Sequence, residues 1–161
     1  MTHPAPTRRA GDQRPSPAAL HAWRTFLRAH ALIVHQLEAE LVAEEDLPLA
    51  SYDVLLQLAE APDRRLRMTE LAGAVLLSRS GLTRLVDRLT RDGLVRRENC
   101  VDDGRGTYAV LTDAGLARLC KAAKVHLPGV RAHMTGHLRP EELETLAGLL
   151  DRLVTEQLAG L

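Results

Sequence analysis

The chain has 161 residues, of which 45% are hydrophobic and only 2% aromatic, and its 21 basic and 21 acidic side chains leave no formal net charge. This composition predicts a core of Leu, Val and Ala, which suits packed helices better than a β-sandwich. No apolar run approaches the ~20 residues that cross a bilayer, no signal peptide is recognisable and two cysteines give no disulfide framework, so we expect a cytoplasmic protein without a membrane partner.

The first 17 residues, MTHPAPTRRAGDQRPSP, combine Pro, Gly and charge, which predicts a disordered arm (1–17) ahead of a single domain over residues 18–161. Apolar residues then recur at steps of three, four and seven, so one long helix is expected over about 18–45, ending before Pro48. We expect Ser51 to cap a second helix, which the next proline closes.

A third, short helix is predicted for MTELAGAVL, with Thr69 at its N-cap. Only Leu76 and Leu77 separate it from the next helix, a spacing typical of a helix-turn-helix. That next helix is expected to start at a cap formed by Ser78 or Ser80. Its apolar residues recur at i, i+3, i+4 and i+7 and predict one buried stripe: Leu82, Leu85, Val86 and Leu89.

Gly93 fits the left-handed position that follows a helix end. After it, the spacing of the apolar residues changes from helical to alternating. Residues 94–111 alternate around a DDGRG turn signal and predict a β-hairpin. We expect Thr112 to cap a further helix, which Pro128 should kink or end near residue 127. A last helix should begin at Pro140 and run to about residue 160.

Charge is concentrated in the middle of the chain. Residues 63–105 contain ten arginines against seven acidic residues, whereas residues 36–60 contain seven acidic residues and neither Lys nor Arg. Six of those arginines fall within residues 78–98, several of them opposite the predicted leucine stripe. A basic patch on a neutral chain predicts contact with a polyanion at one surface.

A helix, a short turn, a basic amphipathic helix and a basic-tipped hairpin together predict a winged helix-turn-helix. The fold class expected is mainly α with a small β wing and a helical dimerisation region. The second helix of such a pair enters the DNA major groove, and a wing arginine can enter the minor groove beside it. The DNA-binding residues predicted are Ser78, Arg79, Ser80, Thr83, Arg84, Arg88, Arg91 and Arg105. Arg64, Arg65 and Arg67 are interpreted as loop charges that either contact phosphate or face solvent.

From about Leu20 to Val154, the chain resembles the MarR (multiple antibiotic resistance regulator) family of bacterial transcription factors. The resemblance lies in SRSGLTRLVDRLTRDGLVRR, in an Asp two residues before an Arg at the hairpin tip, and in VLTDAG. It implies that Asp103 holds Arg105 by an ion pair. It also implies a homodimer on palindromic double-stranded DNA, formed by helices over about 18–45 and 113–160 around a DNA-binding lobe over about 51–112.

The resemblance further implies a repressor that a small-molecule effector, an anionic aromatic compound, releases from DNA. Such regulators usually bind the effector in a cleft between the dimer helices and the winged lobe. Trp23, His30 and Asp53 are the predicted lining, because each places a polar or aromatic group on an otherwise aliphatic helix.

Three alternatives stay open at this point. A zinc sensor would use His126, His133 and His137, which share one face if their helix continues past Pro128. A redox sensor would use Cys100 beside the wing. A DNA-binding architectural protein would need no ligand. An enzyme is not indicated, because the sequence has no phosphate-binding glycine loop, HExxH or GxSxG motif, and no cofactor is expected.

Overall fold

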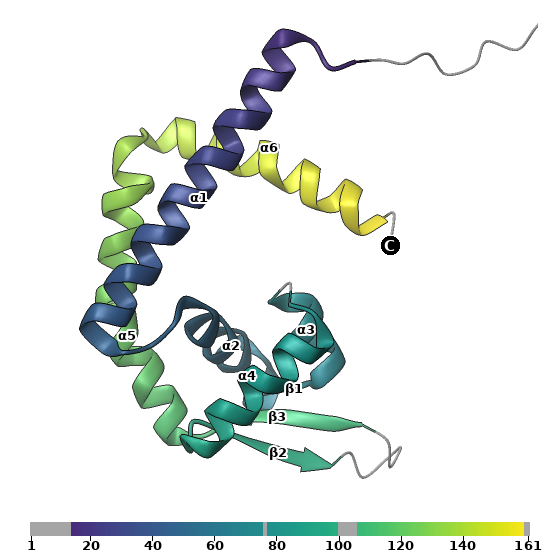
Figure 1. The fold of residues 1–161 in the computed structure, drawn as a ribbon, viewed down its shortest axis with the longest axis vertical. Helices are drawn as coiled ribbons and strands as arrows, with labels where there is room; N and C mark the ends of the chain where they lie inside the picture. The colour runs from purple at the N-terminus through teal and green to yellow at the C-terminus, as the bar shows by residue number, and fades with distance from the viewer. Residues whose placement is uncertain (1–13, 76, 100–105, 160–161) are drawn as a thin grey trace, which may run out of the picture.

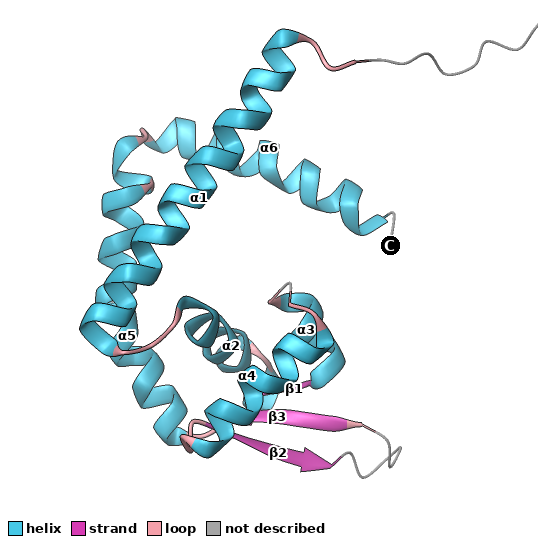
Figure 2. Ribbon diagram, viewed as in Figure 1, coloured by secondary structure: helices cyan, strands magenta, loops and turns pink. Residues whose placement is uncertain are grey.

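The computed structural model describes residues 14–75, 77–99 and 106–159, and Figure 1 shows their arrangement. Figure 2 distinguishes the helices from the small sheet. The helices are α1 (Pro17–Glu45), α2 (Leu49–Glu60), α3 (Met68–Ala74), α4 (Arg79–Arg91), α5 (Asp113–His133) and α6 (Pro140–Ala159), with short 3-10 turns at Pro62–Arg64 and Thr135–His137. The strands are β1 (Arg65–Arg67), β2 (Val95–Asn99) and β3 (Thr107–Leu111). The predicted fold class is confirmed.

The molecule has a compact lobe and a helical arm (Figure 1). The lobe holds α2, α3 and α4 against an antiparallel sheet of order β1-β3-β2. The arm consists of α1 and α5, which lie side by side, and of α6, which crosses α1 beyond the lobe. None of the described helices is both long enough and apolar enough to span a membrane.

One core of aliphatic side chains holds the lobe together and extends to the base of the arm. Its largest fully buried members come from four helices and are Leu41, Leu55, Leu58, Leu71, Leu82 and Leu89. The aromatic ring of Tyr52 and the Val95 and Ala109 side chains close the core beneath them. The core therefore uses Leu, Val and Ala, as the composition indicates.

Two predicted helix caps are wrong. Ser51 lies inside α2, which begins at Leu49 behind Pro48, and only 1% of Ser51 is exposed. The Glu38 carboxylate of α1 caps α2 in its place, because its Oε2 accepts a hydrogen bond of 2.5 Å from the Leu49 amide. In α3 the N-cap lies two residues before the predicted Thr69, at Arg67.

The start of α3 follows from its own glutamate. Arg67 occupies the N-cap position, and its backbone N–H donates a hydrogen bond of 2.9 Å to the Glu70 carboxylate. A Glu three residues after the cap satisfies an amide that the helix itself leaves unpaired. Thr69 therefore lies in the first turn.

Two further features depart from the prediction. α5 continues through Pro128 to His133, so the expected end near residue 127 is wrong. Packing on α1 compensates for the hydrogen bond that the proline removes, since Gly129 lies so close to α1 that an added Cβ would come within 2.9 Å of Leu37 Cδ2. The strand β1 was not predicted, and it pairs with β3 so that Leu66 opposes Ala109.

Candidate nucleic-acid interface and ligand cleft

The outward face of α4 carries the predicted DNA-binding side chains. The Ser78 hydroxyl accepts a hydrogen bond of 3.1 Å from the Gly81 amide and so caps the helix as predicted. The stripe of Leu82, Leu85, Val86 and Leu89 is buried in the lobe. The opposite face is exposed and consists of Arg79, Ser80, Thr83, Arg84, Asp87, Arg88 and Arg91. Burial of the stripe thus orients the guanidinium groups of Arg79, Arg84 and Arg91 toward solvent.

Two side-chain contacts fix α4 relative to its neighbours. The Arg88 guanidinium donates a hydrogen bond of 3.1 Å to the Ser51 hydroxyl in α2. The Asp87 carboxylate pairs with the Arg97 guanidinium of β2 at 2.9 Å. Because Arg97 neutralises the only acidic side chain on this face of α4, the positive potential of the arginines is retained. The sequence analysis missed Arg97 as a functional residue. The signal that could have found it is its position in the alternating run VRREN.

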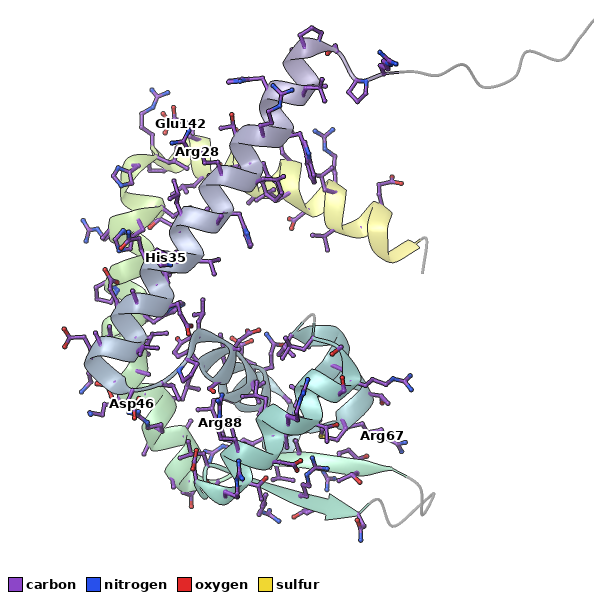
Figure 3. All side chains as sticks on the ribbon, viewed as in Figure 1. Arg28, His35, Asp46, Arg67, Arg88 and Glu142 are labelled. Carbon is purple, nitrogen blue, oxygen red and sulfur yellow. The ribbon has the colours of Figure 1, made fainter. Side chains whose placement is uncertain are left out.

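The sheet beside α4 supplies a second basic element. Arg65 and Arg67 of β1 lie over the ring of Tyr108, with guanidinium carbons 5.1 and 5.7 Å from its centroid. Such stacking holds a guanidinium group in place while it keeps its charge. Figure 3 shows Arg67 at the edge of the lobe. Of the three arginines that were interpreted as loop charges, Arg65 and Arg67 therefore belong to a strand, and Tyr108 was missed as their support. Arg64 ends the 3-10 turn before it and pairs with the Asp113 carboxylate at 3.2 Å.

A polar groove of about 420 Å³ lies between the sheet and the outward face of α4. Its lining combines guanidinium groups with hydroxyl groups: Arg67, Thr69, Thr83, Arg97 and Thr107, with Met68 and Gly106. These are side chains that bind phosphate and sugar oxygens. The predicted wing arginine Arg105, its partner Asp103 and the candidate sensor Cys100 lie outside the described residues.

A second cavity, here called the ligand cleft, separates α1 from α2, the end of α3 and α5. It has a volume of about 870 Å³, and its lining is His30, Ala31, Val34, His35, Glu38, Leu49, Ala50, Tyr52, Asp53, Leu56, Val75, Leu77 and His126. Two of the predicted effector residues, His30 and Asp53, lie in it. Trp23 does not, because it lies nearer the N-terminus of α1, where 56% of it is exposed and it stacks on Phe26.

Burial perturbs two titratable groups of the ligand cleft. Desolvation raises the pKa of Asp53 above its usual value, while a hydrogen bond from Gln57 opposes that shift. Desolvation lowers the pKa of His126 below its usual value, which the charge of Asp53 partly offsets. The His126 ring lies 4.3 Å from the Tyr52 ring, and its Nδ1 is buried without a hydrogen-bond partner among the described residues.

The three candidate zinc ligands are not brought together. His126 faces the ligand cleft, whereas His133 Nε2 lies 2.6 Å from the Glu40 carboxylate on α1. His137 Nε2 lies 2.7 Å from the Ala132 carbonyl oxygen. Within the described part of the chain, no group of three or more His, Cys, Asp or Glu side chains has an arrangement that could hold a metal ion.

Comparison with known proteins gives consistent matches. A family model described as MarR family matches residues 45–106. The chain is 32% identical over 114 residues to the HTH-type transcriptional repressor YetL of Bacillus subtilis (strain 168), an alignment that spans 69% of this chain and 68% of YetL. It resembles the crystal structure of AbsC, a MarR family transcriptional regulator from Streptomyces coelicolor, with a TM-score of 0.83, 38% identity and coverage of 92% of this chain and 99% of AbsC. Sco3205, a MarR family regulator of the same organism solved in complex with DNA, gives a TM-score of 0.83, 39% identity and coverage of 90% and 94%.

Proposed function

Because this chain belongs to the MarR family of DNA-binding transcriptional regulators, we propose that it is an effector-responsive repressor that binds an inverted repeat as a homodimer. The observation that carries the proposal is the outward face of α4, where buried leucines orient Arg79, Arg84 and Arg91 toward solvent. The lobe over about 51–112 binds DNA, and the helices over about 18–45 and 113–160 form the dimer.

Each part of the basic surface has its own role on DNA. Ser80, Thr83 and Arg84 lie near the start of α4 and contact base edges or adjacent phosphates in the major groove. Ser78, Arg79, Arg88 and Arg91 contact phosphate. Arg105, held by Asp103, enters the flanking minor groove. The groove lined by Arg67, Thr69 and Arg97 takes the phosphates between these two contacts.

The apolar surface of the arm supports the homodimer. Large apolar side chains stay exposed on both terminal helices of the isolated chain: Trp23, Phe26 and Leu27 on α1, and Leu149, Leu153 and Val154 on α6. An apolar groove of about 520 Å³ runs between these helices and includes Phe26, Ile33, Leu146 and Leu150. We expect an intertwined two-fold interface of more than ~2,000 Å², typical of obligate dimers.

The effector acts through the ligand cleft. A molecule bound between α1 and α2 changes the angle of the lobe to the arm and so the spacing of the two recognition helices. The alternatives are a zinc sensor, a redox sensor that uses Cys100, and a ligand-independent DNA-binding protein. The separate partners of His133 and His137 favour a small organic effector over zinc. The working compartment is the cytoplasm, where the protein associates with the nucleoid when bound to DNA.

Two measurements test this proposal. Footprinting of the full-length chain on the DNA upstream of its gene should protect an inverted repeat whose half-sites lie about 34 Å apart. Replacement of Leu150 and Leu153 by Asp should give monomers or unfolded chains that lose this protection, whereas Glu144→Gln on the same helix should not. A folded monomer of the parent chain that protects DNA in sedimentation and footprinting experiments would overturn the dimer.

A further inference from the structure

The charges that line the ligand cleft have one sign. Among its described lining residues there is neither Lys nor Arg, while Glu38 of α1 and Asp53 of α2 contribute carboxylates. The rest of the wall is apolar (Val34, Leu56, Val75 and Leu77) or holds imidazole and phenol groups. An organic anion in this cavity would lose its hydration without gaining a cationic partner, which is unfavourable.

One feature of the ligand cleft could still attract an anion. The N-terminus of α2 opens onto it through Leu49 and Ala50, and free amides at a helix N-terminus bind carboxylates and phosphates. Here the chain's own carboxylate occupies that position, because Glu38 Oε2 accepts a hydrogen bond of 2.5 Å from the Leu49 amide. An acidic ligand would have to displace Glu38 and would then lie near a second carboxylate.

The carboxylate that the ligand cleft leaves for a ligand is that of Asp53. Asp53 is only partly buried, and the side-chain hydrogen bond that lowers its pKa comes from Gln57 in the same helix. His126 Nδ1 is buried and has no partner in the described residues, and its ring lies 4.3 Å from that of Tyr52. A carboxylate beside an aromatic wall favours a ligand that donates hydrogen bonds and carries a flat apolar body.

We propose that the ligand cleft binds an amphipathic organic cation, an amine whose ammonium group pairs with Asp53 and whose apolar body lies against Val34, Leu56 and Val75. This inference rests on the proposed function, since it names the effector class of the same cleft. It departs from the aromatic acid that the family resemblance implies, because the described lining offers such an acid two carboxylates and neither Lys nor Arg.

Three probes of one skeleton test the charge preference. Tryptamine is a cation, indole-3-propionate an anion and indole-3-propionamide neutral, with similar size. In calorimetric titrations of the full-length, DNA-free protein, tryptamine should bind about tenfold more tightly than indole-3-propionate, the factor expected when one hydrogen bond to a charged group is gained. Equal or tighter binding of the acid, or no binding of tryptamine at millimolar concentration, overturns the proposal.

A matched pair of variants locates the ammonium group. Asp53→Asn removes one negative charge from the ligand cleft, whereas Glu60→Gln removes one from the exposed end of the same helix, outside the lining. Asp53→Asn should lower tryptamine affinity about tenfold and leave indole-3-propionamide unchanged, while Glu60→Gln should change neither. If Glu60→Gln has the larger effect on tryptamine, the site is wrong. Denaturation curves of both variants establish that each is folded.

Binding of DNA is measured separately with the upstream fragment, so the two proposals fail independently. If the ligand-free protein gives no footprint, the proposed DNA binding is wrong, whatever the calorimetry gives. If the protein binds DNA but prefers the acid to the amine, only the proposed ligand class is wrong. If tryptamine binds with the expected preference but leaves the footprint intact, the ligand class stands and the coupling of the ligand cleft to DNA fails.

Discussion

The Arg88 guanidinium donates a 3.1 Å hydrogen bond to the Ser51 hydroxyl and thereby joins the recognition helix α4 to the first turn of α2. Ser51 is buried, whereas Arg88 is exposed as a whole residue. The same helix α2 lines the ligand cleft through Asp53 and Leu56. A displacement of α2 by a ligand would therefore be transmitted directly to α4, the helix proposed to contact DNA.

This contact gives a prediction that separates stability from DNA binding. Ser51→Ala and Arg88→Ala should each reduce the free energy of unfolding, and a double-mutant cycle should give a coupling of about 1 kcal/mol for the lost hydrogen bond. Only Arg88→Ala should also lower the salt dependence of DNA binding, by about one phosphate per subunit. Urea denaturation and binding at several salt concentrations measure the two effects. If Ser51→Ala lowered the salt dependence of DNA binding by the same amount, the assignment of a phosphate contact to Arg88 alone would be contradicted.

Replacement of Arg84 should relax sequence preference. Arg84 lies on the outward face near the start of α4, where a guanidinium group can bind a guanine edge through two hydrogen bonds. Arg84→Ala should cost about 1–3 kcal/mol per half-site on the cognate sequence and much less on a scrambled duplex. Fluorescence anisotropy on both duplexes measures this difference. Equal losses on the two sequences would reassign Arg84 to phosphate.

The wing arginine should act differently. Arg105→Ala should weaken binding to all sequences alike, or mainly to those with A·T-rich flanks, and should lower the salt dependence by about one phosphate per subunit. Asp103→Ala should give a milder form of the same change, because it loosens the arginine without removing it. The measurement is the salt dependence of affinity on duplexes with A·T-rich and G·C-rich flanks. Unaltered isotherms for Arg105→Ala would exclude the wing from the interface.

Local signals were sufficient to predict α4. Its buried stripe, its Ser78 cap and its outward arginines all follow from residues within one helix, and the structure has them as expected. The cap of α2 could not be found in this way, since it comes from Glu38, which is 11 residues away on another helix. The prediction of Trp23 as a lining residue failed because it also depended on tertiary structure. An aromatic residue on an aliphatic helix does not show that the first half of α1 extends beyond the lobe (Figure 1).

Tertiary packing also overrode two local expectations. α5 continues through Pro128 because Gly129 allows α1 to approach closely at Leu37 and Glu40. β1 forms because Leu66 faces Ala109 on a strand more than forty residues later, a pairing that no alternation within RLR could indicate. The polar groove between the sheet and α4 could therefore not be predicted: Arg67 was noted as a loop charge, and Arg97 was missed.

A glycine in α5 allows a close helix–strand approach and predicts a marked loss of stability. A Cβ at Gly115 would overlap the Leu94 carbonyl oxygen and lie 2.7 Å from Leu111 Cδ1. Gly115→Ala should reduce the free energy of unfolding by about 1–3 kcal/mol, typical of an overpacked core. Gly73→Ala, where a Cβ would meet nothing within 4 Å, should leave it unchanged or raise it by up to about 1 kcal/mol. Equal denaturation midpoints for the two variants would contradict this packing.

The last prediction concerns acidification. Burial lowers the pKa of His126 in the folded chain below the ordinary value of 6.5, so the unfolded chain binds its proton at higher pH. Stability should therefore fall as the pH is lowered through 6.5 toward the depressed value. The titratable groups that surround His126 across the ligand cleft are Tyr52 and Asp53 on α2 and His30, His35 and Glu38 on α1. Urea denaturation between about pH 7.5 and about pH 6 measures the slope of the free energy of unfolding against pH. This pH range lies well above the ordinary pKa values of carboxyl groups.

Three variants assign that slope. His126→Gln should flatten it, because the group that titrates differently in the two states is gone. His21→Gln, which changes an exposed histidine at the start of α1, should leave it as in the parent chain. Asp53→Asn should steepen it, since the carboxylate charge raises the pKa of His126 and its loss depresses that pKa further. If the slope survives His126→Gln unchanged, the acid sensitivity of this fold comes from another group, and folding does not depress the pKa of His126.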